Sequence, residues 1–78
     1  MQDRPQVADG TVRSWDVGEG WGVIDSPAAP GGCWASFAVV EMPGFKQLRA
    51  GQRVRFEFDA LELDGYPFTA RRVEPLPD

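Results

Sequence analysis

The sequence has no histidine and only one cysteine, Cys33, among its 78 residues. Structural zinc sites ordinarily use four cysteine or histidine ligands, so this composition argues against a zinc-binding domain. The absence of histidine also excludes nucleophiles of the Ser–His and Cys–His type. A single thiol cannot form a disulfide within the chain, which suits a reducing compartment. Because Cys33 lies between Gly32 and Trp34 in a predicted strand, we expect it to be a small buried apolar residue.

Long apolar runs and an excess of positive charge are also missing. No stretch approaches the roughly 20 apolar residues that span a bilayer, and residues 1–10 lack the apolar segment of a signal peptide. We therefore expect a cytoplasmic protein with no membrane partner. Lys and Arg number 8 against 12 Asp and Glu, which gives a net charge of −4. This balance argues against a binder of duplex DNA, which normally carries a basic stripe, but permits a single-strand binder that uses stacking.

Glycine and proline are abundant, at 9 and 7 residues, and they separate short segments that are typical of β-strands. Alternation is clearest around residues 52–61, where Val54, Phe56 and Phe58 share one face and the intervening charged residues share the other. No segment keeps a helical period, although one helical turn is expected at 45–48. The pattern predicts strands at about 10–16, 20–25, 33–37, 52–61 and 66–73.

These strands predict an all-β fold with a single domain. At this length a closed five-stranded barrel is the simplest arrangement, because closure leaves no exposed sheet edge. The domain is expected at residues 8–75, after a flexible N-terminal lead-in at 1–7 and before a flexible tail at 76–78. A core of this size rarely supplies more than about 3–5 kcal/mol of stability.

The most informative feature is a tryptophan bracketed by glycines, Gly20-Trp21-Gly22. Glycine weakens a strand interior and often marks the close approach of a ligand or of another backbone. Trp34 alternates in a similar way with the small residues Cys33 and Ala35, which suit a tight barrel interior. We therefore expect Trp21 and Trp34 to share one exposed face, where flat rings can stack on a ligand. The alternative is that some of the tryptophans are core residues, since tryptophan is usually well buried.

Two patterns that could indicate catalysis or phosphate binding are weak. Asp16, Glu19 and Asp25 lie close in sequence, but a glycosidase needs two carboxylates across a cleft, for which a small barrel has little room. The glycine-rich run at 18–22 has the wrong spacing for a dinucleotide-binding loop, and no helix follows it. We therefore expect no enzymatic activity, no small-molecule substrate, and no cofactor or metal.

Five segments in order resemble a bacterial cold-shock protein, and the similarity extends from Gly10 to about Val73. Residues 19–24, Glu-Gly-Trp-Gly-Val-Ile, resemble the family's first ribonucleoprotein motif, Lys-Gly-Phe-Gly-Phe-Ile. Residues 33–37, Cys-Trp-Ala-Ser-Phe, resemble its second motif, Val-Phe-Val-His-Phe. Each match is short, but their order and spacing together are specific. The other segments resemble the family's opening strand, long loop and fourth strand, at 10–13, 44–48 and 51–57.

The resemblance implies a divergent cold-shock domain, a five-stranded antiparallel oligonucleotide-binding barrel (OB-fold). Such proteins bind single-stranded RNA and DNA with little base preference and can melt RNA structure. The expected partner is therefore single-stranded RNA or DNA, bound by a monomer. Arg13 is expected to contact phosphates, together with Lys46, Arg71 or Arg72. Carried over by position, the nucleic-acid-binding residues are Arg13, Trp15, Trp21, Val23, Trp34, Ser36, Phe37 and Phe45.

Several positions depart from the family pattern. Ser14, Val23 and Ser36 replace a tryptophan, a phenylalanine and a histidine, so three stacking platforms are lost. Asp16 and Glu19 replace an asparagine and a lysine, which brings negative charge toward the phosphates. Since each stacked base contributes about 1–3 kcal/mol, we expect weaker binding over a shorter footprint than a typical member shows.

The lead-in to the fifth strand, at 61–66, looks longer than in the family and leaves the register of that strand open. An alternative function is a protein-interaction module on the same barrel, since an exposed aromatic patch with few basic residues also suits a protein partner. Salt dependence separates these hypotheses, because nucleic-acid affinity falls as salt rises whereas a hydrophobic contact barely responds.

Overall fold

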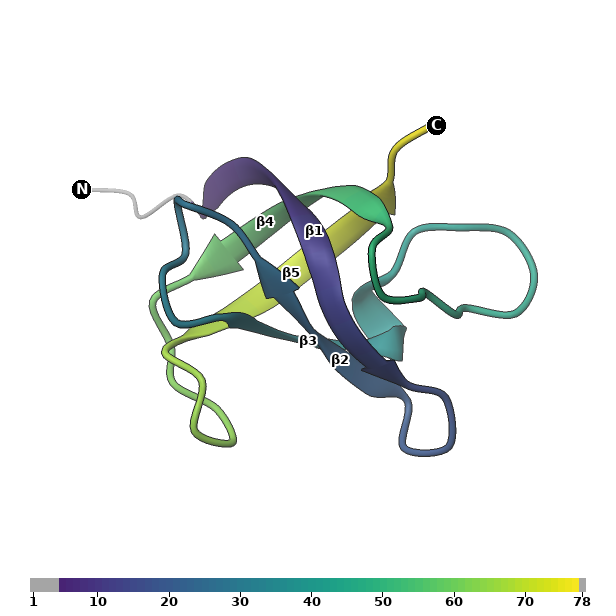
Figure 1. Ribbon diagram of the computed structural model, residues 1–78, viewed down its shortest axis with the longest axis horizontal. Helices are drawn as coiled ribbons and strands as arrows, with labels where there is room; N and C mark the ends of the chain where they lie inside the picture. Colours follow the sequence, from purple (N-terminus) through teal and green to yellow (C-terminus); the bar gives the residue numbers. More distant parts are fainter. Residues whose placement is uncertain (1–4, 78) are drawn as a thin grey trace.

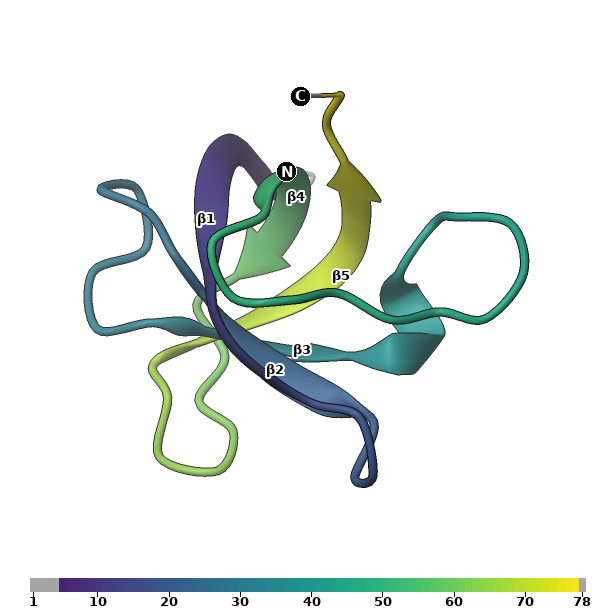
Figure 2. The ribbon, with the colours of Figure 1, turned by 45° about the vertical axis from the view of Figure 1, so that its right-hand side comes forward.

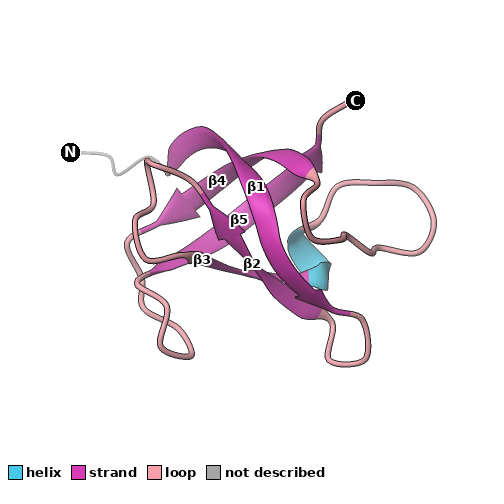
Figure 3. Ribbon diagram, viewed as in Figure 1, coloured by secondary structure: helices cyan, strands magenta, loops and turns pink. Residues whose placement is uncertain are grey.

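The computed structural model describes residues 5–77 and shows a closed β-barrel. The strands follow one another around the barrel in the order β1-β2-β3-β5-β4, and β4 closes on β1 (Figures 1 and 3). Neighbouring strands are antiparallel except for β3 and β5, which run parallel. The predicted all-β, five-stranded barrel is therefore confirmed, with this one parallel pairing as a correction. The elements are β1 (Gln6–Asp16), β2 (Trp21–Asp25), β3 (Cys33–Ser36), the short 3₁₀ helix η1 (Phe37–Val39), β4 (Arg53–Asp59) and β5 (Phe68–Pro75).

β4 supplies the largest side chains of the core. Val54, Phe56 and Phe58 are at most 1% exposed, as their alternation predicts. The rings of Phe56 and Phe58 stack with centroids 4.9 Å apart, and Phe68 of β5 meets Phe58 edge-on at 5.6 Å. Cys33 is fully buried, and burial raises the pKa of its thiol to about 12. The predicted role of Cys33 as a small apolar residue is therefore confirmed.

β1 is longer than predicted because it serves two neighbours. Its first half pairs with β4, and its second half pairs with β2. Gln6 and Val7, expected in a flexible lead-in, lie in the sheet opposite Phe58 and Glu57 of β4. The expected lead-in is therefore wrong for these two positions, while residues 1–4 lie outside the described residues.

The helical turn expected at 45–48 lies instead at η1 (Figure 3). Ser36 caps it, because the side-chain oxygen of Ser36 accepts a hydrogen bond from the backbone N–H of Ala38 at 3.1 Å. Gly44 has a φ of 76°, so the chain turns just before the expected helix rather than entering it. Across residues 5–77 we find no helix with the length and apolar character that a membrane crossing requires.

The connections gather at the two ends of the barrel. The β1–β2 turn and the long connection from η1 to β4 lie at one end, and the β2–β3 and β4–β5 loops lie at the other (Figures 1 and 2). β5 begins at Phe68 rather than at Tyr66, because Tyr66 belongs to a tight turn with Leu63. The expected tail is held at its start, where the backbone N–H of Leu76 donates to the carbonyl oxygen of Arg53 at 3.0 Å.

Candidate nucleic-acid interface

The outer surface of β2 and β3 carries two neighbouring tryptophans, Trp21 and Trp34, and we name it the β2–β3 face. Gly22 and its partner Ala35 are buried on the inner side. Trp21 and Trp34 are the chain neighbours of these two residues, so their side chains point outward. The indoles are nearly parallel, with centroids 6.0 Å apart and 21° between their planes. The two rings thus lie on one outer face, as expected. They are half-buried and stack on each other rather than stand apart.

Trp15 lies on a different surface, which corrects the expectation of a single aromatic face. The β1–β2 pairing has a register irregularity between Val12 and Ser14, and beyond it Trp15 pairs with the inward-pointing Gly22. The Trp15 side chain therefore packs against the barrel core. A Cβ on Gly22 would overlap the Trp15 ring, so glycine at this position leaves room for the indole.

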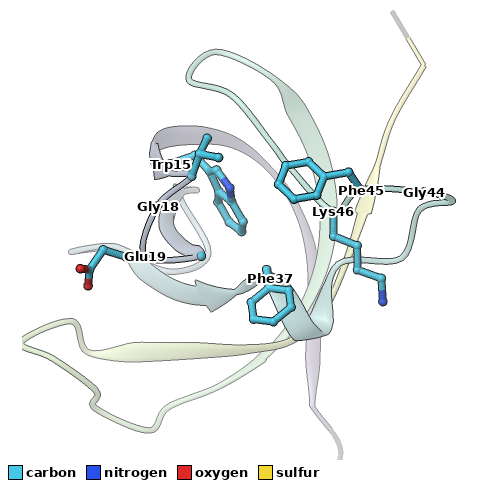
Figure 4. Close-up of a pocket in the computed structure, with 9 residues that line it drawn as sticks. Trp15, Gly18, Glu19, Phe37, Gly44, Phe45 and Lys46 are labelled. Carbon is cyan, nitrogen blue, oxygen red and sulfur yellow. The ribbon is translucent and has the colours of Figure 1, made fainter.

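Trp15 also helps to line a pocket at one end of the barrel, which we name the end pocket (Figure 4). The volume of this pocket is about 440 Å³. Phe37 and Phe45 lie around it together with Trp15, and they are 52% and 72% exposed. Glu19 lies on one side of the pocket and Lys46 on the other. The pocket thus has flat apolar walls, with one charge of each sign at its edges.

A second hollow connects the end pocket with the β2–β3 face. Trp15 and Val17 line both hollows, and Trp21 lines the second one. The two hollows therefore adjoin at Trp15 and Val17, and we name their aromatic side chains, together with Trp34 stacked on Trp21, the aromatic strip. The predicted platforms form two adjoining groups rather than a single row.

Arg13, expected beside the nucleic-acid backbone, is held by Asp25. Nη2 of Arg13 lies 2.6 Å from one carboxylate oxygen of Asp25, and Nε lies 3.0 Å from both oxygens. These hydrogen bonds hold the pKa of Asp25 below its ordinary value and the pKa of Arg13 above its own. The guanidinium thus already binds a carboxylate in the geometry that a phosphate would use. The pair uses Nε and Nη2 and leaves Nη1 of the half-exposed guanidinium without a hydrogen-bond partner among the described residues.

The Arg13–Asp25 pair predicts a shifted acid titration. Because the pKa of Asp25 is lowered from 3.8 by folding, the pair stabilises the fold above that pH. The contribution is lost as the pH falls through the lowered value, and it is small because the side chains are 44% and 50% exposed. Carboxyl-carbon NMR shifts recorded against pH should show a midpoint for Asp25 below 3.8. Arg13→Gln should move it back toward that value, and a midpoint that does not respond would contradict the pairing.

Val23, expected on the binding surface, is covered by its neighbours, whereas Ser36 lies on the outer side of β3 beside Trp21 and also caps η1. Val23 is only 1% exposed although it lies on the outer side of β2. A Cβ placed on Gly32 would lie 3.0 Å from Val23 Cγ1, 3.0 Å from Arg13 Nη2 and 3.1 Å from Tyr66 Cδ1. These side chains therefore lie close together and cover Val23. Ser36 is half-buried and serves as the cap of η1.

Tyr66 belongs to the aromatic surface, although its sequence context does not predict this. Its ring centroid lies 6.4 Å from that of Trp21, and Cζ of Arg13 lies over the tyrosine ring at 5.9 Å from the centroid. The sequence feature that could have drawn attention to Tyr66 is its position directly after the turn-forming pair Asp64-Gly65. That pattern is typical of the start of a strand, and it does not reveal that the turn folds back toward β2.

The arginines of β5 are engaged with acidic residues. Arg71 and Arg72, expected to contact phosphates, form ion pairs with Asp59 and Glu57 of β4 at 2.9 and 3.6 Å. Lys46 beside the end pocket forms no such pair within the described chain, so its charge is available to a ligand. In the same part of the chain, no three Cys, Asp or Glu side chains gather into a group that could hold a metal ion.

No family model matches this chain. Two curated relatives are similar to it, and both are named Cold shock-like protein CspD. The protein from Haemophilus influenzae is 35% identical over 48 residues, which cover 62% of this chain and 67% of the relative. The protein from Vibrio cholerae is 30% identical over 53 residues, which cover 68% of this chain and 70% of the relative. With the five-stranded barrel, this similarity shows that the chain belongs to the cold-shock family, whose members in general bind nucleic acids.

Proposed function

We propose that this protein binds single-stranded RNA or DNA by stacking unpaired bases on its aromatic surface. The observation that carries the proposal is the aromatic strip that joins Phe37 and Phe45, through Trp15, to the stacked pair of Trp21 and Trp34. Every base has a flat face that can stack on such rings, whatever the sequence. In a duplex those faces are covered by neighbouring base pairs, so the strip favours unpaired strands. Stacking of this kind also suits an RNA chaperone, and it requires no catalysis.

The electrostatics of the surface limit the affinity. Arg13 is engaged with Asp25, and Glu19 places a negative charge at the end pocket. Each phosphate contact to a single strand adds about −0.7 to the slope of log affinity against log salt. With Lys46 and Arg13 as the contacts, we expect a shallow slope between about −0.7 and −1.4. Binding is thus weak and depends mainly on stacking.

Quenching of tryptophan fluorescence by oligothymidine or oligouridine tests the proposal, because all three tryptophans line the aromatic strip or the hollows beside it. We expect saturable quenching at oligonucleotide concentrations up to tens of micromolar, and much less with a blunt duplex of the same length. Absence of quenching by the single strands would favour the protein-interaction alternative, for which the apolar walls of the end pocket provide the supporting observation.

Glu19→Lys is expected to tighten oligonucleotide binding at low salt. Glu19 is one of the residues that line the end pocket, and its carboxylate points outward at the edge of the pocket (Figure 4). A negative charge there repels phosphates that approach the pocket. The new lysine should make the salt slope steeper by about 0.7 for each phosphate that it neutralises. Titrations across a salt series measure this change.

The matched control is Glu74→Lys, which makes the same change of net charge on the exposed side of β5. It should leave the slope nearly unchanged. If Glu19→Lys behaves like the control, Glu19 does not face the bound strand.

A further inference from the structure

The β4–β5 loop brings a tyrosine onto the β2–β3 face. Leu63 and Tyr66 exchange two backbone hydrogen bonds, both of 2.9 Å, around Asp64 and Gly65. The turn residues have φ values of 54° and 88°, the positive values that a type I′ turn requires and that an Asp-Gly pair adopts readily. Tyr66 is therefore held at the end of a tight turn rather than on a loose loop.

The turn also packs against the neighbouring β2–β3 loop. Cγ of Pro67 lies 2.9 Å from the point that a Cβ on Gly31 would occupy, and Cδ1 of Tyr66 lies 3.1 Å from the corresponding point on Gly32. Both glycines have positive φ, 98° and 108°, so larger residues are disfavoured there. The two glycines supply the space into which Tyr66 and Pro67 fit, and this contact fixes the position of the ring.

Tyr66 is half-buried, like the stacked tryptophans beside it. Its plane is inclined by 58° to that of Trp21, at a centroid distance of 6.4 Å. The Arg13 guanidinium, itself held by Asp25, lies within cation–π distance of the ring at 5.9 Å. Three elements thus position the tyrosine, which stands as an inclined third ring at the edge of the β2–β3 face.

We infer that Tyr66 is a further base-binding residue, which stacks one unpaired nucleobase beyond those held by Trp21 and Trp34. The inference rests on the proposed function and adds a contact to the same site. A ring that only helped to enclose Val23 could be replaced by any apolar side chain of similar bulk. Stacking needs a flat π-face as well, and this requirement separates the two roles.

Substitutions of Tyr66 test the inference and leave all three tryptophans in place as fluorescent probes. Tyr66→Ala removes the ring, Tyr66→Leu keeps apolar bulk without a π-face, and Tyr66→Phe keeps the π-face. Against oligothymidines of graded length, the alanine and leucine variants should bind about tenfold more weakly, equivalent to about 1.4 kcal/mol. Their affinity should stop rising at a strand about one nucleotide shorter than for the parent protein. The phenylalanine variant should bind like the parent.

Leu61→Ala is the matched control, because it truncates a 58% exposed apolar side chain of the same loop and should not change affinity. Parent-like binding by Tyr66→Leu would overturn the inference while leaving the proposed function intact. A loss in Tyr66→Phe equal to that in Tyr66→Leu would also overturn it, because the ring face is retained. Failure of the parent protein to bind any of the oligonucleotides would instead refute the proposed function. Should Tyr66→Ala unfold in a thermal melt, the leucine and phenylalanine variants decide the question.

Discussion

Replacing both Trp21 and Trp34 by alanine is expected to weaken oligonucleotide binding by at least about thirtyfold while the barrel stays folded. Each ring contributes about 1–3 kcal/mol to a stacked base, so the two together supply at least about 2 kcal/mol. Neither ring belongs to the buried cluster that stabilises the barrel. Each single substitution should cost at least about 1 kcal/mol of binding free energy. The thirtyfold figure is the sum of the two single losses; because the rings stack on each other, the departure of the double variant from that sum measures the coupling between them.

Anisotropy of a labelled oligothymidine measures these affinities without relying on the tryptophans that are removed. Trp21→Phe and Trp34→Phe are the matched controls, since each keeps a smaller stacking ring and should recover much of the lost affinity. Circular dichroism melts show whether each variant remains folded. Parent-like binding by the double alanine variant would exclude the β2–β3 face as the contact surface, whereas unfolding of either single variant would identify that ring as structural.

Features that depend on neighbouring residues in the sequence could be predicted. Alternation along β4 places Val54, Phe56 and Phe58 in the core, and small flanking residues place Trp21 and Trp34 on the outer face. These predictions succeed because successive side chains point to opposite faces of a strand, and the partner strand need not be known. The same reasoning identified Cys33 as buried.

Features that depend on register or on distant contacts could not be predicted. The irregularity in β1 changes which face the following residues present, so Trp15 points into the end of the barrel rather than toward Trp21. Arg13 and its partner Asp25 are 12 residues apart and meet only after β1 and β2 have paired. Tyr66 reaches the β2–β3 face from a loop, where hydrophobic periodicity carries no information about the contact.

Gly22→Ala is expected to destabilise the barrel more than any other single-methyl addition in the β1–β2 hairpin. A Cβ at this position would overlap the backbone carbonyl oxygen of Ser14 and the indole of Trp15. A backbone atom cannot rotate away, so either the two strands separate or the tryptophan leaves its place at the end pocket. Overpacking of this kind costs about 1–3 kcal/mol, in a domain that is expected to have only about 3–5 kcal/mol in total. The melting temperature should therefore fall by at least about 4–8 °C.

Gly18→Ala isolates the steric cause of that loss. Gly18 lies in the β1–β2 turn, where the nearest atom to an added Cβ is a carboxylate oxygen of Asp16 at 3.5 Å, an ordinary contact. Both variants add one methyl group to the same hairpin, so the difference between their melting temperatures measures the overlap at Gly22. Because Trp15 lines the end pocket and the adjoining hollow, Gly22→Ala should also weaken oligonucleotide binding at temperatures where it remains folded. Equal melting temperatures would contradict the overlap at Gly22 and the packing of Trp15 against β2. Trp15 could then not be the residue that connects the end pocket with the stacked tryptophans.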